Sequence, residues 1–367
     1  MSAAAVVRRA PGKLFVAGEY AVVDAGNPAV LVAVDRYVTV SVAPRRLPGV
    51  EISSDLGPAA STWRWSGTHL TPDPGPGEGA GGGLVHVRAA IETVAALLAD
   101  HGRLLPPLTL EVTSGLHQGG TKYGLGSSGA VTVATIAALA AFAGLDLDAH
   151  ARLKLALLAT ARHDPRASGG DLAASTWGGW VYYQAPDRPQ MVHLADRVGV
   201  AAALDAPWPH LAVRSLPAPA GLSVEVGWTG TPASTAALVA DLDRASWRGG
   251  PAYRRFTAAT GACVQDLVAA LTGQDRPAVL AAVHAAGTQL ADLDRQVGLG
   301  VFTPALRALV EHARAAGGAA KPSGAGGGDC GIALLPVDGP RPAAWLHRAW
   351  HSAGVLPLPL KVAAEGT

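Results

Sequence analysis

The chain has 367 residues, 49% of them hydrophobic and 16% charged, so it is long enough to form about two folded domains. Its formal net charge is only +1, with 29 basic against 28 acidic residues, and we therefore expect neither nucleic acid nor a membrane as a partner. The two cysteines cannot build a disulfide framework and the first residues lack the apolar core of a signal peptide, so a cytoplasmic location is expected.

Apolar stretches interrupted by glycine, proline or asparagine open the chain, a pattern typical of strands joined by turns. The expected strands are residues 13–17, 29–34 and 37–42, and they predict an antiparallel start. Residues 71–83 (TPDPGPGEGAGGG) are too rich in proline and glycine for regular structure. We expect this segment to be a loop that could move over a substrate.

The middle of the chain predicts helices around a short strand. Apolar spacing predicts helices over residues 84–100, 127–143 and 147–163, and a strand over 108–112. The most apolar run, residues 130–145, is too short for a membrane span, and we interpret it as a buried helix. The stretch ASGGDLAAS is expected to be a loop, and the strand-like GGWVYY follows it.

A proline-rich passage at residues 206–221 marks the expected boundary between a domain of residues 1–218 and one of residues 219–367. The second domain alternates strands and helices, which predicts an α+β fold. Its expected elements are strands at 222–228 and 330–335, and helices at 253–271, 277–289, 303–316 and 341–352.

Residues 122–131 (KYGLGSSGAV) contain the letters G-x-G-x-x-G at Gly124, Gly126 and Gly129. The context does not favour a dinucleotide-binding fingerprint, because the preceding HQGGTKY is polar and no second strand with an acidic end follows. What remains is a glycine loop that runs into a helix beginning with two serines, where backbone amides and the helix dipole favour a phosphate group. A serine-capped turn without a ligand is the alternative.

Three other stretches combine glycine with polar side chains. Lys13 begins a strand that leads into GEY, Asp171 follows two glycines, and residues 319–334 (AAKPSGAGGGDCGIAL) interleave charged and hydroxyl side chains with glycines. Their ordinary alternatives are a surface lysine, a turn aspartate and a flexible connector. Only five of the 29 basic residues are lysines, so each lysine that the composition has retained, Lys122 included, is a candidate for a specific role.

Taken in order, PGKLFVAGEYAVV, KYGLGSSGAV and KPSGAGGGDCGIAL resemble the three motifs of the GHMP kinase superfamily. The sequence lacks the signatures of P-loop nucleoside triphosphatases and of protein kinases. Its His and Cys residues show no metal-ligand spacing. Within the superfamily, ASGGDLAASTWGGW, GWTGTPAS and AAKPSGAGGGDCG are similar to phosphomevalonate kinases, with mevalonate kinases next. The resemblance implies an N-terminal domain like domain 2 of ribosomal protein S5, a ferredoxin-like C-terminal domain, and the use of ATP and Mg²⁺.

The resemblance also implies roles for individual residues. The ATP phosphates would lie against Lys122 and the loop residues Gly124, Leu125, Gly126, Ser127, Ser128 and Gly129. Lys13, Lys122 and Asp171 would be catalytic, and Ser128 and Asp171 would lie near the metal ion. The acceptor would contact Lys13, Tyr20, Ser168, Gly169, Gly324, Gly326 and Gly327.

The implied reaction is the ATP-dependent phosphorylation of 5-phosphomevalonate to 5-diphosphomevalonate by a monomer or homodimer. One position departs from mevalonate kinases, because Thr160 stands where they carry a glutamate that helps to hold magnesium. Arg36 and Lys321 are further candidates for binding the acceptor's phosphate and carboxylate. The alternatives are a mevalonate kinase, another small-molecule kinase of the superfamily, and an inactive ligand-binding regulator with this fold.

Overall fold

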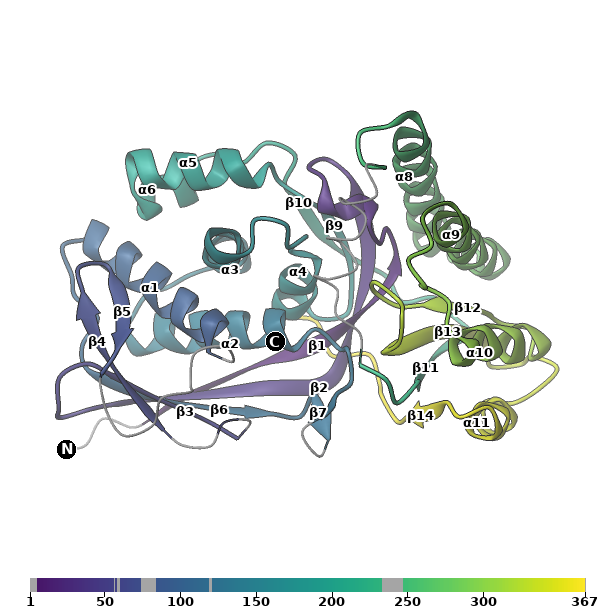
Figure 1. Cartoon of the computed structure of the whole chain (residues 1–367), viewed down its shortest axis with the longest axis horizontal. Helices are drawn as coiled ribbons and strands as arrows, with labels where there is room; N and C mark the ends of the chain where they lie inside the picture. Colours follow the sequence, from purple (N-terminus) through teal and green to yellow (C-terminus); the bar gives the residue numbers. More distant parts are fainter. Residues whose placement is uncertain are drawn as a thin grey trace.

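The spine of the first half is a pair of long antiparallel strands, β1 (Val6–Ala17) and β2 (Pro28–Pro44). In the computed structural model these strands reach the junction between the two halves of the molecule (Figure 1). The residues described are 5–55, 57, 60–73, 84–118, 121–232 and 247–366. From Ala10 onward β1 is buried, which suits its run of apolar residues. The three predicted opening strands are confirmed, although two of them belong to the single strand β2.

A mixed sheet extends from this pair in the order β10-β9-β2-β6-β3-β4-β5, and helices cover one of its faces (Figure 1). Its other strands are β3 (Val50–Ser54), β4 (Ser61–Ser66), β5 (His69–Pro72), β6 (Leu108–Ser114), β9 (Trp180–Gln184) and β10 (Ala212–Leu216). The helices are α1 (Val85–Asp100), α2 (Ser127–Phe142), α3 (Ala149–His163), α4 (Gly170–Trp177), α5 (Arg188–Val198) and α6 (Val200–Asp205). In α2, Ala130, Ala134 and Leu139 are 0% exposed, so the predicted buried helix is confirmed.

The second half is built around strands that pair antiparallel in the order β12-β13-β11-β14. Its strands are β11 (Leu222–Trp228), β12 (Ala319–Pro322), β13 (Cys330–Pro336) and β14 (Leu356–Leu358). Its helices are α8 (Pro251–Thr272), α9 (Arg276–Val297), α10 (Pro304–Ala315) and α11 (Ala343–Ser352). The chain order is β11, then α8 to α10, then β12 and β13, then α11 and β14. This succession of strands and helices is the ferredoxin-like arrangement. The predicted α+β class and the ferredoxin-like second domain are confirmed.

Two segments that were expected to be irregular are regular. The stretch ASGGDLAAS is not only a loop, because α4 begins at Gly170 after the left-handed Gly169 (φ 80°). Glycine and aspartate have low helix propensity, which hides this short helix from apolar spacing. The proline-rich passage at 206–221 contains β10, which pairs with β9 in the first sheet. Proline is tolerated beside such an edge strand, so composition alone did not predict it.

Other boundaries differ from the prediction or go beyond it. Further elements that were not predicted are helices α5 and α6, strands β3, β4, β5, β12 and β14, and the antiparallel pair of β7 (His117–Gln118) and β8 (Thr121–Lys122). The predicted loop at 71–83 begins within β5, and its residues 74–83 lie outside the described residues. Near its end the chain returns to the first sheet, where the amide of Ala363 donates to the carbonyl of Ala33 at 2.9 Å. The domain boundary at 218/219 stays a prediction.

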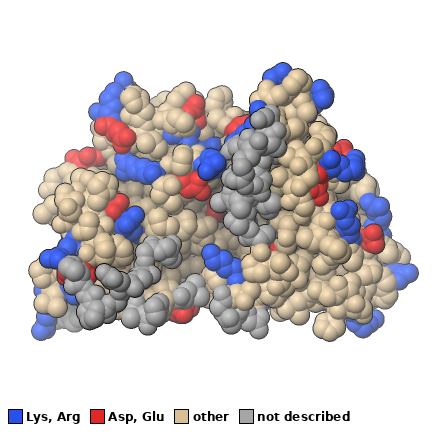
Figure 2. Space-filling view, viewed as in Figure 1, with Lys and Arg blue, Asp and Glu red and all other residues tan. Residues whose placement is uncertain are grey.

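The surface carries charges of both signs (Figure 2), and both thiols are buried. On the face drawn in Figure 2, Lys and Arg side chains are interspersed with Asp and Glu rather than gathered in one extended area. Within the described ranges, no helix has the length and apolar character needed to cross a bilayer. Cys263 and Cys330 are both buried free thiols.

Candidate active site

The glycine loop of KYGLGSSGAV leads into α2 as the sequence predicts. Gly126 is the N-cap of the helix in the left-handed conformation (φ 76°), and no side chain caps the first turn from this position. Gly124 is also left-handed (φ 78°), so the loop needs residues without a Cβ at both places. Ser127 and Ser128 form the first turn, where the positive end of the helix dipole lies.

Each of the three pattern glycines lies against a polar side chain from another motif. A methyl group on Gly124 would come within 2.4 Å of the Asp329 Cγ atom, and one on Gly126 within 2.8 Å of the Lys13 Cε atom. A methyl group on Gly129 would lie 2.5 Å from Asp171 Oδ2. A methyl group at any of these positions would force the neighbouring side chain or the loop to shift, so the glycines allow the lysine and both carboxylates to approach the loop. This close approach explains the G-x-G-x-x-G letters without a dinucleotide.

Lys13 and Asp171 meet at the start of α2. Lys13 is only 7% exposed, its backbone amide donates to the carbonyl of Leu125 at 2.8 Å, and its Nζ atom lies 5.2 Å from the Phe15 ring centre. Asp171 occupies the first turn of α4, and its Oδ1 atom accepts from the Leu172 amide at 3.0 Å. Burial raises the pKa of Asp171 above its ordinary value, although the charge of Lys13 and backbone N–H groups act against this rise.

Lys122 lies at the approach to the loop, exposed, at the end of β8. It faces His117 across the β7–β8 hairpin. Its charge also reaches His86 in the first turn of α1, which forms a 3.1 Å hydrogen bond with His163 of α3. Burial, His163 and Lys122 together lower the pKa of His86 from 6.5 to about 4, against an opposing effect of Asp164.

The predicted acceptor residues lie around two turns. Tyr20 is 4% exposed, has a left-handed backbone (φ 62°) that is uncommon for a bulky residue, and donates from its hydroxyl to the carbonyl of Ala325 at 2.5 Å. Ser168 is half-buried, and its carbonyl accepts from the Tyr183 hydroxyl at 2.8 Å. Gly169 lies so close to that ring that a methyl group would be 2.7 Å from the hydroxyl.

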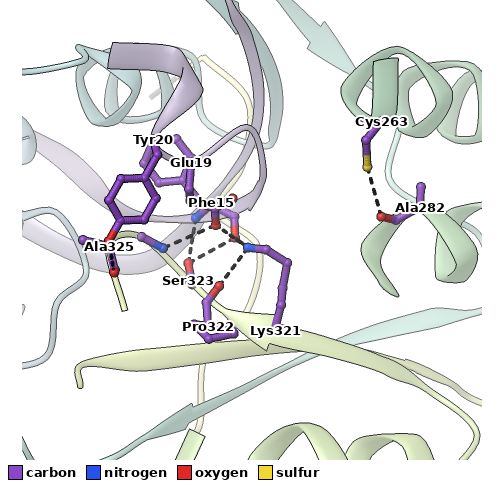
Figure 3. A network of polar contacts seen from close by, with 10 residues as sticks. Phe15, Glu19, Tyr20, Cys263, Ala282, Lys321, Pro322, Ser323 and Ala325 are labelled. Atoms are coloured by element: carbon purple, nitrogen blue, oxygen red, sulfur yellow. Dashed lines mark hydrogen bonds and ion pairs between the residues drawn. The ribbon is translucent and has the colours of Figure 1, made fainter. Parts of the chain in front are cut away.

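The third glycine-rich segment is attached to the end of β1, as Figure 3 shows. Lys321 is 0% exposed, and its ammonium group forms an ion pair with Glu19 and donates to the carbonyl of Pro322 at 2.8 Å. Ser323 Oγ accepts from the Phe15 amide at 2.8 Å and donates to the Phe15 carbonyl at 3.1 Å. The hypothesis that Lys321 binds the acceptor is therefore wrong, because its ammonium is buried and occupied.

Three of these residues were not identified as site residues from the sequence: Glu19, Ser323 and Asp329. Asp329 packs against Gly124 and holds the chain after β11, since its amide donates to the Thr231 carbonyl at 2.8 Å and its carbonyl accepts from the Thr229 amide at 2.9 Å. Polar residues embedded in glycine-rich or apolar motifs were the available signal. Their partners, however, lie up to about 300 residues away in the chain.

Two further predicted positions have a local structural explanation. The Arg36 guanidinium lies 5.1 Å from the centre of the Tyr123 ring, so its place in acceptor binding stays a prediction. Thr160 is 8% exposed, and its buried hydroxyl finds no hydrogen-bond partner among the described residues. A threonine at this point of α3 supplies no carboxylate for a metal ion.

Comparisons with known proteins identify the family to which the chain belongs. The family description "GHMP kinases N terminal domain" matches residues 86–179, and "GHMP kinases C terminal" matches residues 267–354. The chain is 58% identical over 366 residues to a phosphomevalonate kinase of Streptomyces sp. (strain CL190), with 98% of each chain covered. It is 29% identical to a mevalonate kinase of Thermococcus onnurineus (strain NA1), over 98% of this chain and 97% of the relative.

Among solved structures, a Streptococcus pneumoniae phosphomevalonate kinase in complex with phosphomevalonate and AMPPNP aligns with a TM-score of 0.84 and 27% identity, over 97% of this chain and 99% of that chain. The Lin0012 protein of Listeria innocua aligns with a TM-score of 0.87 and 29% identity, over 99% of both chains. The chain therefore belongs to the GHMP kinase superfamily, as its three motifs predicted.

We predict that Gly129→Ala impairs catalysis without impairing the fold. The added methyl group would meet the Asp171 carboxyl at 2.5 Å and displace it, and a displacement of about 1 Å can lower kcat by roughly a hundredfold. Steady-state kinetics would measure this loss. Gly261→Ala in α8 is the matched control, because a methyl group there meets nothing within 4 Å. The control should keep its activity and gain about 0.5 to 1 kcal/mol of stability from helix propensity. Normal kcat in Gly129→Ala would contradict a catalytic role for Asp171 at this position.

A second prediction concerns acid stability. His86 is neutral in the folded protein down to a pH of about 4 but takes up a proton near pH 6.5 when unfolded, so the folded state loses stability as pH falls between these values. The loss is at most about 3 kcal/mol for a shift of this size. Denaturant unfolding from pH 7 to pH 4 should show a shallower pH dependence for His86→Gln than for the wild type. His351→Gln, on an exposed histidine of α11, is the control. Equal slopes in all three proteins would refute the assignment to His86.

Proposed function

We propose that this protein transfers the γ-phosphoryl group of ATP to the phosphate of 5-phosphomevalonate and forms 5-diphosphomevalonate. The 58% identity to the Streptomyces phosphomevalonate kinase over nearly the whole chain carries this proposal. The alignment with the Streptococcus pneumoniae enzyme in complex with phosphomevalonate and AMPPNP supports it. The approach of Lys13 and Asp171 to the glycine loop supplies a fitting place for phosphoryl transfer.

The acceptor in this reaction needs no strong base. A phosphate monoester has its second pKa near 6, so at neutral pH it is already largely ionised and nucleophilic. Asp171 therefore acts mainly by orienting Lys13, whose charge it faces, and its carboxylate would help to hold a Mg²⁺ ion bound with ATP. In a kinase for an alcohol, the same carboxylate would have a proton to remove, and its raised pKa would suit that task.

Repulsion between the acceptor phosphate and the triphosphate is the main obstacle to this reaction. Phosphoryl transfer is catalysed largely by positioning and by cations that neutralise the transferring group. Lys13, with its stem against Gly126, and Lys122, at the approach to the loop, are the cations that we assign to this work. A compact ammonium group is not replaced by a planar guanidinium without a change in geometry.

We infer that Mg²⁺ arrives with the nucleotide. Magnesium prefers oxygen ligands and is commonly held by one or two carboxylates together with substrate phosphates. The described residues contain no group of three or more His, Cys, Asp or Glu side chains that could hold a metal ion. Asp171 and Ser128 offer a carboxylate and a hydroxyl beside the loop, which fits a metal bound largely by the phosphates of ATP.

The direct test is a panel of acceptors. ADP release is measured by a coupled assay with mevalonate, phosphomevalonate, diphosphomevalonate, homoserine and galactose in parallel. We expect turnover with phosphomevalonate and little with the others. Mevalonate kinase is the second candidate, because a relative with that name is 29% identical over 98% of this chain. Turnover of mevalonate but not of its phosphate would favour that candidate, and no turnover of any acceptor would favour a regulator.

The role of Lys122 is tested by Lys122→Met. Removing one donor to the transition state typically lowers kcat on the order of a hundredfold, and we expect a loss of at least this size. Lys361→Met is the control, because Lys361 is an exposed lysine whose hydrogen bonds with Asp35 use only its backbone. Stopped-flow or steady-state kinetics with saturating ATP would separate kcat from KM. Activity near the wild-type value would remove Lys122 from the catalytic group.

A further inference from the structure

A buried ion pair joins the two halves of the molecule beside the site. Glu19 follows β1 in the first half, and Lys321 belongs to β12 in the second. Their side chains are 3% and 0% exposed. We propose that this pair is a positioning device for phosphoryl transfer, which holds residues 321–329 in register with residues 13–20. The proposal rests on the proposed function only in naming the reaction that is positioned.

Stability alone does not account for this buried ion pair. Charges removed from water lose their hydration, and a buried ion pair is often no better for stability than apolar residues of similar size. Burial lowers the pKa of Lys321, and the nearby positive charge of Lys13 acts in the same direction, while Glu19 opposes both. Two buried ammonium groups thus lie in this region, and Glu19 is the carboxylate paired with that of Lys321.

The ion pair also contacts backbone groups of residues 13–20 and of residues 321–329. Besides Glu19, the ammonium group of Lys321 donates to the carbonyls of Pro322 at 2.8 Å and Phe15 at 3.5 Å. The carboxylate of Glu19 also accepts from the amide of Gly324 at 3.4 Å. Figure 3 shows these bonds converging from β1 and from the strand that carries Lys321. A pair bonded in this way fixes how far one segment can slide along the other.

The two segments joined by the ion pair carry side chains that contact the phosphate loop: Lys13 on the first and Asp329 on the second. Lys13 lies two residues before Phe15, its ammonium packs over the Phe15 ring, and both backbone groups of Phe15 are held by Ser323. At the end of residues 321–329, the Asp329 side chain contacts Gly124 of the phosphate loop. A shift of residues 321–329 would therefore be transmitted to Lys13 and to the loop together.

The segment also reaches the acceptor side of the site. The Tyr20 hydroxyl donates to the carbonyl of Ala325, in the middle of the glycine-rich stretch. Gly324, Gly326 and Gly327 have left-handed backbones with φ values of 90°, 71° and 74°. Such a backbone needs external contacts to stay in one conformation, since glycine has more conformational freedom than other residues. The ion pair at its start and the Tyr20 hydroxyl supply such contacts, together with the carbonyl of Val301, which accepts from the Gly327 amide at 2.9 Å.

The test separates stability from positioning with a double variant. Glu19→Leu and Lys321→Met singly leave one buried charge without its partner, so each should lower Tm by roughly 5 °C or more. Together they remove both charges, and Tm should return to within a few degrees of the wild-type value. If the pair positions the segments, the double variant has a kcat at least about tenfold below that of the wild type, measured with the acceptor that the wild type uses. A stable double variant with wild-type kcat would overturn the proposal.

A matched control is the exposed pair Arg276–Asp338, whose side chains are 39% and 64% exposed. The double variant Arg276→Met/Asp338→Leu should keep both Tm and kcat. If the Glu19→Leu/Lys321→Met protein fails to fold, Glu19→Asp is the second variant, because it keeps both charges but shortens the reach of the carboxylate toward Lys321. We expect it to lower kcat at least about fivefold, and wild-type kcat would contradict the account.

A readout without turnover keeps this inference separate from the proposed function. Amide hydrogen exchange at residues 323–328 should speed up in the double variant and remain unchanged in the surface control. This result is expected whichever acceptor the enzyme uses. Unchanged exchange there would overturn the positioning role. Failure of the wild type to phosphorylate phosphomevalonate would instead overturn the proposed function alone.

Discussion

The site depends on three positions where the phosphate loop carries no side chain. At Gly124, Gly126 and Gly129 the backbone is approached by Asp329, Lys13 and Asp171, at distances that a single methyl group would prevent. Each of these side chains comes from a different part of the chain: one from β1, one from the first turn of α4 and one from just before β13. The glycines thus allow a lysine and two carboxylates to converge on one loop and the start of one helix.

The seam between the two halves is part of this arrangement. The turn after β1 reaches the second half through Glu19, Tyr20 and Asp24, and these contacts involve Lys321, Ala325 and the pair of Arg248 and Tyr253. A phosphoryl-transfer site between two domains needs such contacts, since its catalytic groups must keep their relative positions to a fraction of an ångström. The strained backbone of Tyr20 lies in the middle of this turn, where the contacts on both sides can hold it.

Much of this could be predicted from the sequence where the signal is local. Apolar spacing predicted α1, α2 and α3, and the polar approach to the glycine loop argued against a dinucleotide site. The short helix α4 was missed because glycine and aspartate at its start have low helix propensity, and its formation depends on packing against β1 and β2. The true partner of Lys321 was missed because it lies 302 residues away, and a lysine in a glycine-rich loop gives no sign of being buried.

The central claim is that the protein phosphorylates a phosphate, and the chemical connectivity of the product tests it most directly. The wild-type enzyme is incubated with ATP, Mg²⁺ and 5-phosphomevalonate, and the purified product is examined by phosphorus NMR. The account predicts a diphosphate, seen as two phosphorus signals coupled to each other. Two uncoupled monoester signals would mean that a hydroxyl group had been phosphorylated instead, and would contradict the account.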